Sequence, residues 1–369
     1  MEIEVQDALS DRLTAEWDGF LSNAVHQHVR QDPRFGPVDL AEGNEVRYAL
    51  GRENGGVKAV GLFTLRPHPF LPGAFTNAIS LSGPVSDDPA VFVSFMEGVR
   101  RHKAFAKVGR ISVTPYWLDE QAEELGAHLA GRGWIMSEPR YLRLTGIVDI
   151  TGTASDIASQ FSQTCRRKLR KAEKEDLEVV ALQEDADAAD FLARLNCHRT
   201  ERGLGALRQD AFMTTFEHVY RGGDLGVIRV IYHRGRFVAG IVLHRSRDTT
   251  HFIYSVHDDE VLAELNNLRI SPFLMLDAMK WASEKGCRYF DLEGYGNPDD
   301  PDNPLKHIHK YKSEFKPTPT LRVPQHHKIS NRMIYLSGNF KDILKNWIKA
   351  KILKRQKYFD SKWHHKDPR

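Results

Sequence analysis

The sequence predicts an α/β protein made of two copies of one unit, each a mixed and mostly antiparallel sheet flanked by helices. A predicted hairpin, helix and strand follow one another early in the chain, and the same order returns in its second half. Gly61 and Gly240 stand at matching places in these strands, and Gly109 and Gly286 each end a helix before a strand. The two intervals, 179 and 177 residues, nearly agree, which favours a duplication over a chance recurrence of a common order.

Hydrophobic periodicity and turn residues place the elements of each unit. In the first unit these signals predict a helix at 14–23, followed by strands at 46–50 and 57–65 that are joined by Asn54-Gly55-Gly56. They then predict a helix at 91–105, a strand at 111–114, a helix at 120–130 and a strand near 141–144. In the second unit they predict strands at 227–232, 237–243 and 252–256, a helix at 271–285 and a strand at 288–292. A chain of 369 residues with 41% hydrophobic content can form two domains. We expect them at 1–150 and 151–320, with a basic tail at 351–369.

The segment from 271 to 315 has the features of an active-site edge. Ser271 is a suitable N-cap, Pro272 suits the first turn, and Gly286 suits a left-handed C-cap. After the strand at 288–292 comes a loop rich in Asp, Asn and Pro, which ends at a lysine, Lys312. The alternative interpretation is a buried strand followed by an ordinary surface loop.

A basic helix is predicted at 156–175, between the two units. Apolar residues fall near one face, and residues 166–174 contain six bases and one acid. The bases are Arg166, Arg167, Lys168, Arg170, Lys171 and Lys174. Charge runs on helices are usually solvated faces, but this density favours an anionic partner.

The segment 340–357 repeats this pattern of basic residues around an apolar stripe. Phe340, Leu344, Trp347 and Ile348 follow helical spacing, and seven lysines or arginines surround them. Such a helix can bind RNA phosphates, lie on an anionic membrane, or simply dock on the core.

Composition excludes several classes of protein. The 52 Lys+Arg nearly balance the 49 Asp+Glu, so nucleic-acid contacts must come from local patches. Cys165, Cys197 and Cys287 form no CxxC motif, and no histidine pair is accompanied by acidic residues at ligand spacing, so we expect no metal site. The N-terminus has no apolar signal region, and no apolar run reaches the roughly 18 residues that span a bilayer. The expected location is the cytoplasm.

The turn before the predicted helix at 271–285 bears on the cofactor. An acetyltransferase of the GNAT type cradles the pyrophosphate of coenzyme A with a glycine-rich turn at this place. Here the turn at 265–270 reads Leu-Asn-Asn-Leu-Arg-Ile and has no glycine. We therefore expect a GNAT-like layout that does not use coenzyme A.

Four motifs together resemble the Fem family of aminoacyl-tRNA-dependent transferases, which build peptidoglycan cross-bridges. They are the run at 165–174, Phe252-Ile253-Tyr254, the run at 285–291, and Tyr311-Lys312-Ser313-Glu314-Phe315. The resemblance spans about residues 17–324 and implies two GNAT-like domains in tandem, with about 321–350 completing the first. The family's Phe-Gly-Gly is here Phe315-Lys316-Pro317, and Arg208 is followed by Phe212 where the family has tyrosine. These departures bear on the acceptor more than on the fold.

The resemblance also implies site residues and partners. Catalysis would rest on Lys312, as donor to the oxyanion, and Asp291, as acceptor of the amine proton. Arg208, Tyr254 and Tyr311 would bind the acceptor, and the six bases of 166–174 would bind tRNA. Each residue also has an ordinary reading: a surface lysine, a turn-capping aspartate, a loop arginine or a core tyrosine.

The implied function is transfer of an amino acid from aminoacyl-tRNA to an amine of a peptidoglycan precursor, nucleotide- or lipid-linked, or of a related peptide. No cofactor is expected besides aminoacyl-tRNA as co-substrate, and 340–357 could contact the inner face of the membrane. The second hypothesis is a GNAT-like acyltransferase that uses acyl-CoA or an acyl carrier protein on a polysaccharide or small metabolite. The interval of 21 residues from Asp291 to Lys312 favours the first. A third hypothesis is a tRNA- or membrane-binding protein without activity.

Overall fold

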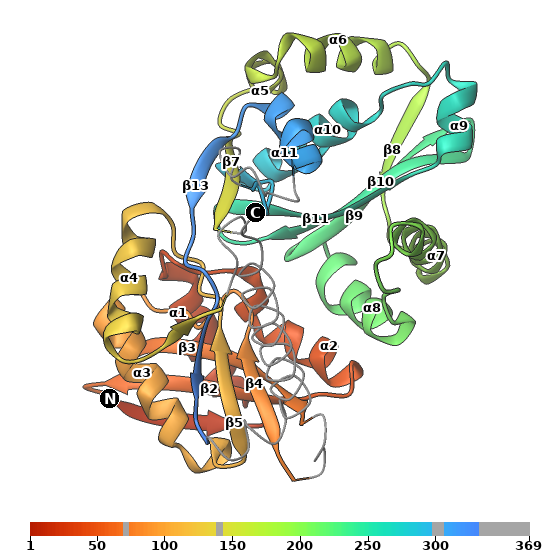
Figure 1. Cartoon of the computed structure of the whole chain (residues 1–369). Coiled ribbons are helices and arrows are strands. Elements are labelled where there is room, and N and C mark those ends of the chain that lie inside the picture. The colour runs from red at the N-terminus through yellow and green to blue at the C-terminus, as the bar shows by residue number, and fades with distance from the viewer. Residues whose placement is uncertain (69–73, 138–142, 297–305, 332–369) are drawn as a thin grey trace, which may run out of the picture.

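The structure, a computed structural model, describes residues 1–68, 74–137, 143–296 and 306–331. It contains two seven-stranded sheets, one in each of two domains (Figure 1). The first sheet has the order β1 (Glu2–Gln6), β2 (Glu45–Glu53), β3 (Gly56–Pro67), β4 (Thr76–Ser80), β5 (Val108–Val113), β14 (His326–Ile329) and β6 (Ile135–Met136). Only the pair β4–β5 is parallel among these described strands.

The second sheet repeats this order. It runs β8 (Leu177–Ala181), β9 (Gly226–His233), β10 (Arg236–Arg245), β11 (Thr249–His257), β12 (Tyr289–Asp291), β7 (Leu144–Asp149) and β13 (Thr318–Leu321). Its one parallel pair in the described chain, β11–β12, corresponds to β4–β5. The predicted fold class is therefore confirmed. Gly61 and Gly240 occupy equivalent strands, β3 and β10, whereas Gly109 lies inside β5 and does not end a helix.

The chain crosses between the domains twice. β7 precedes the expected boundary at residue 150, yet it pairs with β12 of the second sheet, Val148 opposite Phe290. Both side chains are buried in the same core, which explains why this strand belongs to the second domain. β13 also joins the second sheet, and β14 returns to the first, between β5 and β6. The strand expected near 141–144 begins at Leu144, and residues 138–142 lie outside the described part.

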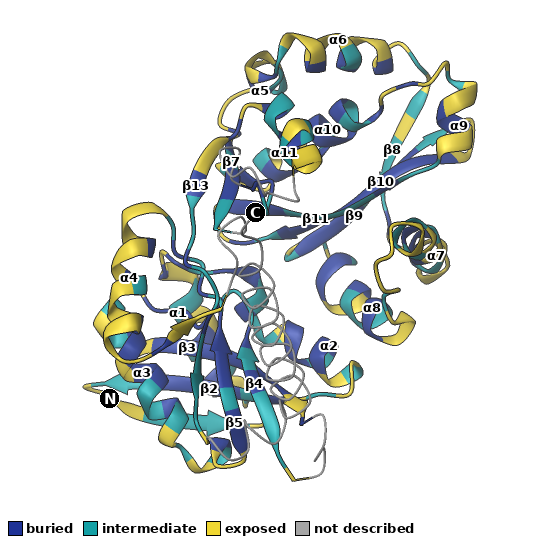
Figure 2. Cartoon of the chain, in the orientation of Figure 1, coloured by how far each residue is buried: buried dark blue, intermediate teal, exposed yellow. Residues whose placement is uncertain are grey.

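The helices form three layers around the two sheets (Figures 1 and 2). α3 (Pro89–Arg101) and α4 (Asp119–Gly131) cover the outer face of the first sheet. α5 (Ala154–Gln160), α6 (Gln163–Ala172) and α10 (Ser271–Glu284) cover the outer face of the second. Between the sheets lie α1 (Asp11–Asn23), α2 (Gly36–Ala41), α7 (Asp185–Glu201), α8 (Gln209–Thr215) and the π-helical turn Phe216–Tyr220.

The middle layer joins the two domains through one hydrophobic core. Trp17 and Phe35 of the first domain and Phe191 and Phe216 of the second are at most 1% exposed and belong to the same cluster. Apolar area removed from water contributes about 25 cal/mol per Å², so separating the domains would expose several large aromatic side chains at a substantial cost. The two domains are therefore held together by a core to which both contribute.

Three local predictions are corrected. The helix expected at 156–175 is broken at Phe161 because Ser162 caps a new helix, accepting a hydrogen bond from the Cys165 N–H at 3.1 Å. Ser271 is the first residue of α10 and not its cap, although Gly286 is left-handed (φ 83°) as expected. The polar loop before Lys312 ends in a short helix, α11 (Lys306–Lys312), followed by the 3-10 turn Ser313–Phe315.

Candidate functional site

The second sheet opens where β11 and β12 part. The two strands pair only from Thr249 opposite Tyr289 to His251 opposite Asp291, and β11 then continues to His257 paired with β10 on its other side. The register against β10 shifts at Val242/Leu243, which leaves Ile253 as an extra residue on β11. A bulge re-aims neighbouring side chains and frees backbone groups from the ladder. The opening is therefore a place where a ligand can meet strand backbone.

Lys312 lies at this opening. Its Nζ is 5.9 Å from the ring centroid of Phe252 on β11, and it donates hydrogen bonds to the carbonyls of Glu293 (2.8 Å) and Gly294 (3.0 Å). The side chain is only 6% exposed. Burial lowers the pKa of Lys312 to about 8, against the opposing pull of the Glu293 and Asp291 carboxylates. A buried ammonium next to an opening is an uncommon arrangement, typical of functional sites.

Asp291 is fully buried and surrounded by donors. Its Oδ2 accepts from the Tyr116 hydroxyl at 2.8 Å, and its Oδ1 accepts from the Thr145 hydroxyl and from the Glu293 N–H at 2.7 Å. Burial disfavours its charge, but His251, Thr145 and the Glu293 N–H outweigh burial and hold the pKa of Asp291 below its usual value. A carboxylate held in this way fixes the backbone of Glu293, two residues after it.

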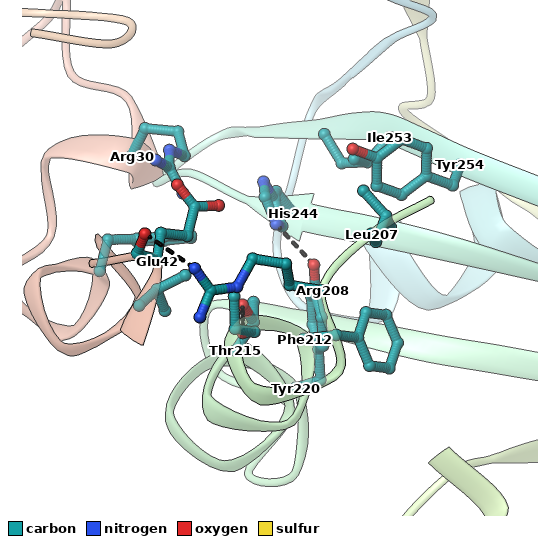
Figure 3. A pocket seen from close by; sticks show the side chains of 13 residues that line it. Arg30, Glu42, Leu207, Arg208, Phe212, Thr215, Tyr220, His244, Ile253 and Tyr254 are labelled. Carbon is teal, nitrogen blue, oxygen red and sulfur yellow. Dashed lines mark hydrogen bonds between the residues drawn. The ribbon is translucent and has the colours of Figure 1, made fainter. Parts of the chain in front are cut away.

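Arg208 and Tyr254 come together in a pocket of about 140 Å³ between the domains (Figure 3). The first domain contributes Arg30, Phe35, Val38 and Glu42; the second also contributes Leu207, Ala211, Phe212, Thr215, Tyr220, His244 and Ile253. Tyr254 is two residues from Phe252 on β11, about 7 Å along the strand at roughly 3.3 Å per residue. The strand β11 therefore contributes Tyr254 to the pocket and Phe252 to the surroundings of the Lys312 ammonium.

Two arginines give the pocket a positive character. Arg208 pairs with Asp210 and donates to the backbone carbonyl of Glu42 at 3.1 Å, which ties the two domains together. Arg30 lies 4.4 Å over the Phe35 ring and 3.5 Å from Asp39. Arginines in such a setting suit bidentate contact with phosphate or carboxylate.

His244 offers a further polar group to this pocket. Its Nε2 is 2.8 Å from the Tyr220 hydroxyl, and its Nδ1 has no hydrogen-bond partner among the described residues. Burial, with Arg30 and His251 nearby, lowers the pKa of His244 well below the usual value. A neutral imidazole with a free nitrogen can bond to a ligand. The sequence analysis named neither Arg30 nor His244.

Tyr311 does not line this pocket. Its ring packs against the outer core of the second domain, 5.4 Å from the Phe315 ring, and its hydroxyl bonds to Ser271 at the start of α10. Burial raises the pKa of Tyr311 far above the ordinary value. Its place indicates that it anchors the segment that carries Lys312.

Five of the six predicted basic residues lie on α6, on the outer side of the second domain, and Lys174 follows the end of this helix. All but Lys168 are exposed, and Lys168 bonds to Glu314 at 2.7 Å. Four of them, Arg167, Lys168, Lys171 and Lys174, line an open hollow of about 570 Å³ whose other wall is the turn at 265–269. Spacings of three and four residues place this stripe on one helix face. Arg166 and Arg170 point elsewhere.

That turn obtains its shape without glycine. Asn266 and Asn267 both have left-handed backbone (φ 55° and 54°), a conformation that asparagine tolerates better than most residues. The turn leads directly into α10. The hollow therefore combines four basic side chains with one acid, Glu175, and this excess of positive charge suits an anionic group.

His28, His251 and Glu293 could reach one metal ion by distance alone. However, Nδ1 of His28 accepts from the Arg30 N–H at 3.1 Å, so in the neutral ring Nε2 carries the proton. Both nitrogens of His251 are also engaged, with Glu293 and with Ser246. The hydrogen bonds account for these ligand atoms, and the cluster is better described as an interdomain network.

No helix in the described ranges is long and apolar enough to cross a bilayer. The segment 340–357, for which membrane or RNA contact was predicted, lies outside the described residues, as does the tail at 351–369.

Comparison with known proteins agrees with this architecture. The Acetyltransferase (GNAT) domain family matches residues 159–312, in the second domain. No curated protein matches the chain. Among solved structures, the crystal structure of FemX has a TM-score of 0.75 at 15% identity and covers 91% of this chain and 99% of its own. L-PGS from Bacillus licheniformis is also similar, with a TM-score of 0.53 at 14% identity over 88% of this chain and 96% of its own. A tandem GNAT protein from the clavulanic acid biosynthesis pathway has a TM-score of 0.53 at 11% identity over 89% of this chain and 99% of its own. The predicted resemblance to the Fem family is thus confirmed in the fold, two GNAT-like domains in tandem.

Proposed function

We propose that this chain is an aminoacyltransferase that moves an amino acid from aminoacyl-tRNA to an amine of a peptidoglycan precursor or a related peptide. The observation that carries the proposal is the place of Lys312, a buried ammonium held at the opening between β11 and β12. The GNAT domain match and the likeness to FemX support an acyl transfer at this position.

The chemistry requires little more than positioning and charge. The amine nitrogen attacks the carbonyl carbon of the aminoacyl ester, an oxyanion forms, and the bond to the ribose oxygen breaks as the amine proton passes to that oxygen. Two protons of the Lys312 ammonium bond to the carbonyls of Glu293 and Gly294, and the third serves the oxyanion. Asp291, whose oxygens are engaged by buried donors, acts here through the Glu293 backbone that it holds and not as the first proton acceptor.

Each of the two candidate binding regions suits a different substrate. The hollow lined by Arg167, Lys168, Lys171 and Lys174 suits the phosphates near the 3′ end of tRNA, since it lies at the start of α10. The pocket with Arg30, Arg208 and Tyr254 suits the anionic part of the acceptor. Both regions flank the element that carries Lys312.

A specific observation also supports the second candidate, an acyltransferase that uses acyl-CoA. The left-handed Asn266 and Asn267 give the turn before α10 a form that glycine would otherwise supply, and a pyrophosphate could bind there. Calorimetry separates the two: tight acetyl-CoA binding would favour the acyl-CoA donor.

The test of the proposal is a transfer assay. The protein is incubated with a mixed pool of radiolabelled aminoacyl-tRNAs and a muropeptide precursor, and label in the precursor is measured with and without ribonuclease. We expect ribonuclease-sensitive transfer that falls by about 100-fold in Lys312→Met, the scale for loss of one oxyanion donor. Lys310→Met and Lys316→Met, both at exposed neighbours, should lose far less. Transfer that resists ribonuclease, or a Lys312→Met variant with normal turnover, would refute it.

A further inference from the structure

A histidine outside both substrate regions joins the two domains next to Lys312. His251 lies on β11 and is fully buried. Its ring is 4.2 Å from the ring of His28 and 5.1 Å from that of Tyr116, both from the first domain. The Tyr116 hydroxyl in turn bonds to Asp291. The first domain thus covers the face of the ring that the second domain leaves open.

Both nitrogens of His251 are held. Nε2 is 3.0 Å from Ser246 Oγ, which accepts the Val29 N–H of the first domain at 3.1 Å. Nδ1 is 3.0 Å from Glu293 Oε1 and 3.7 Å from Asp291 Oδ2. A ring bonded through both nitrogens and flanked by the His28 and Tyr116 rings has one orientation. It therefore presents its Nδ1–H to Glu293 in a constant position.

Glu293 is the residue that this donor restrains. Its backbone is left-handed (φ 56°), a conformation that is unfavourable for a residue with a side chain and persists only when contacts hold it. Its N–H bonds to Asp291, its side chain bonds to His251, and its carbonyl accepts from Lys312. The same residue therefore connects His251 to the ammonium.

We infer that His251 is a positioning residue for Lys312, acting through Glu293: its Nδ1–H holds the strained Glu293 backbone so that the carbonyl fixes the ammonium. The role of Lys312 in transfer rests on the proposed function, but the positioning itself is a property of the protein alone. The groups that face His251 are Asp291 and Glu293 from its own domain and His28 and Tyr116 from the other. Burial favours the neutral ring, yet the two carboxylates raise the pKa of His251 to about 9, so the donor is present at neutral pH.

The test uses two histidine replacements that differ in which nitrogen they imitate. His251→Asn places an amide N–H near the position of Nδ1 and keeps the donor to Glu293. His251→Gln reaches the position of Nε2 and keeps the contact with Ser246 instead. Because Glu293 is partly exposed, Glu293→Gln and Glu293→Ala form a second pair with little risk to folding: the first keeps a side-chain acceptor and the second removes it.

The first measurement needs no substrate. The amine of Lys312 is labelled by reductive methylation across pH 6.5–11, and the extent at this residue is read by mass spectrometry. The wild-type midpoint is expected near 8. In His251→Gln and Glu293→Ala the freed amine reaches solvent, and the midpoint should rise by about one unit or more towards the ordinary value of a lysine. In His251→Asn it should stay near 8, and in Glu293→Gln, which loses a carboxylate that raises the pKa of Lys312, it should not rise.

The second measurement is transfer. The turnover number of His251→Gln should fall by about tenfold or more, with KM little changed, because misplacement of a catalytic group costs mainly the chemical step. His251→Asn should retain most of the turnover. An unmoved labelling midpoint in His251→Gln and Glu293→Ala, or equal losses in His251→Asn and His251→Gln, would overturn the inference. Shifted midpoints in a protein that transfers nothing would support the positioning and reject the proposed function.

Discussion

The Nζ of Lys312 lies 2.8 Å from the carbonyl oxygen of Glu293, within a site that is almost closed to water. A backbone carbonyl stabilises the ammonium by hydrogen bonding but carries no full negative charge. Desolvation therefore outweighs the attraction of the carboxylates further away, and the pKa of Lys312 falls to about 8. Lys312 is thus a cation at neutral pH that loses its proton at a lower pH than an ordinary lysine.

The first prediction is a loss of turnover at alkaline pH. If the ammonium stabilises the oxyanion, turnover should fall by about tenfold per pH unit above pH 8, as the fraction of charged Lys312 decreases. Initial rates at saturating substrates are measured from pH 6.5 to 10, with the hydrolysis of the ester in the absence of enzyme subtracted. The residual turnover of Lys312→Met should lack this alkaline fall. A wild-type rate that keeps rising through pH 9.5 would exclude a cationic role.

The second prediction concerns stability. The folded pKa, about 8, lies below the ordinary value of 10.5, so between these values the unfolded chain holds a proton that the folded protein has lost. The free energy of unfolding should therefore rise with pH across this window, by on the order of 3 kcal/mol from this group. Denaturant unfolding of the wild type and of Lys312→Met at pH 7.5 and pH 10 measures the difference. The variant should lack this contribution, while Lys310→Met, at an exposed site, should follow the wild type.

The elements that could be predicted from sequence are those with local signals. Period-two alternation and the turn Asn54-Gly55-Gly56 located β2 and β3, and Gly286 located the end of α10. The helix α7 also has a local signal, a helical spacing of apolar residues, from which no helix was predicted. These residues are Ala188, Phe191, Leu192 and Leu195. By contrast, the partner of β7 is set by a long-range packing of Val148 against Phe290, which no local pattern encodes.

The residues of the candidate site also divide into those with a local sequence signal and those without one. Lys312 and Arg208 were named because short motifs resemble a family, and α6 because its charges are adjacent in sequence. Arg30 stands more than 200 residues before His244 and His251, and none of the three lies in a motif. They meet only because the domains share one core, and isolated arginines and histidines give no advance sign of that.

A third prediction tests the basic hollow. Arg167→Ala with Lys171→Ala removes two charges that line it, and should weaken tRNA binding and reduce the slope of log K against log salt by about 1.5 to 2. Arg166→Ala with Arg170→Ala removes the same charge from the same helix outside the hollow and is the matched control. Filter binding over a range of salt concentrations gives both slopes. Equal effects would mean that α6 acts as a uniform charged face.

A fourth prediction follows from the duplicated glycine positions. A Cβ at Gly240 would stand 2.6 Å from the Phe191 ring and 3.3 Å from the carbonyl of Arg229, so Gly240→Ala should destabilise the protein by about 1–3 kcal/mol. Gly19, on the exposed face of α1, has nothing within 4 Å of its added Cβ. Gly19→Ala should instead stabilise by about 0.5–1 kcal/mol. Thermal unfolding of both variants checks the opposite signs.

The last prediction concerns Arg208 in the interdomain pocket. If this guanidinium binds the anionic part of the acceptor, Arg208→Ala should raise the KM for the acceptor by about tenfold or more, since a charged hydrogen bond contributes about 1.5–3 kcal/mol. The turnover number and the KM for aminoacyl-tRNA should change little, because the contact is made equally in the ground state and in the transition state. Arg202→Ala, at an exposed arginine six residues earlier, is the control and should alter neither constant. A variant that loses turnover at an unchanged acceptor KM would show that Arg208 acts mainly through its bond to Glu42, by holding the domains together.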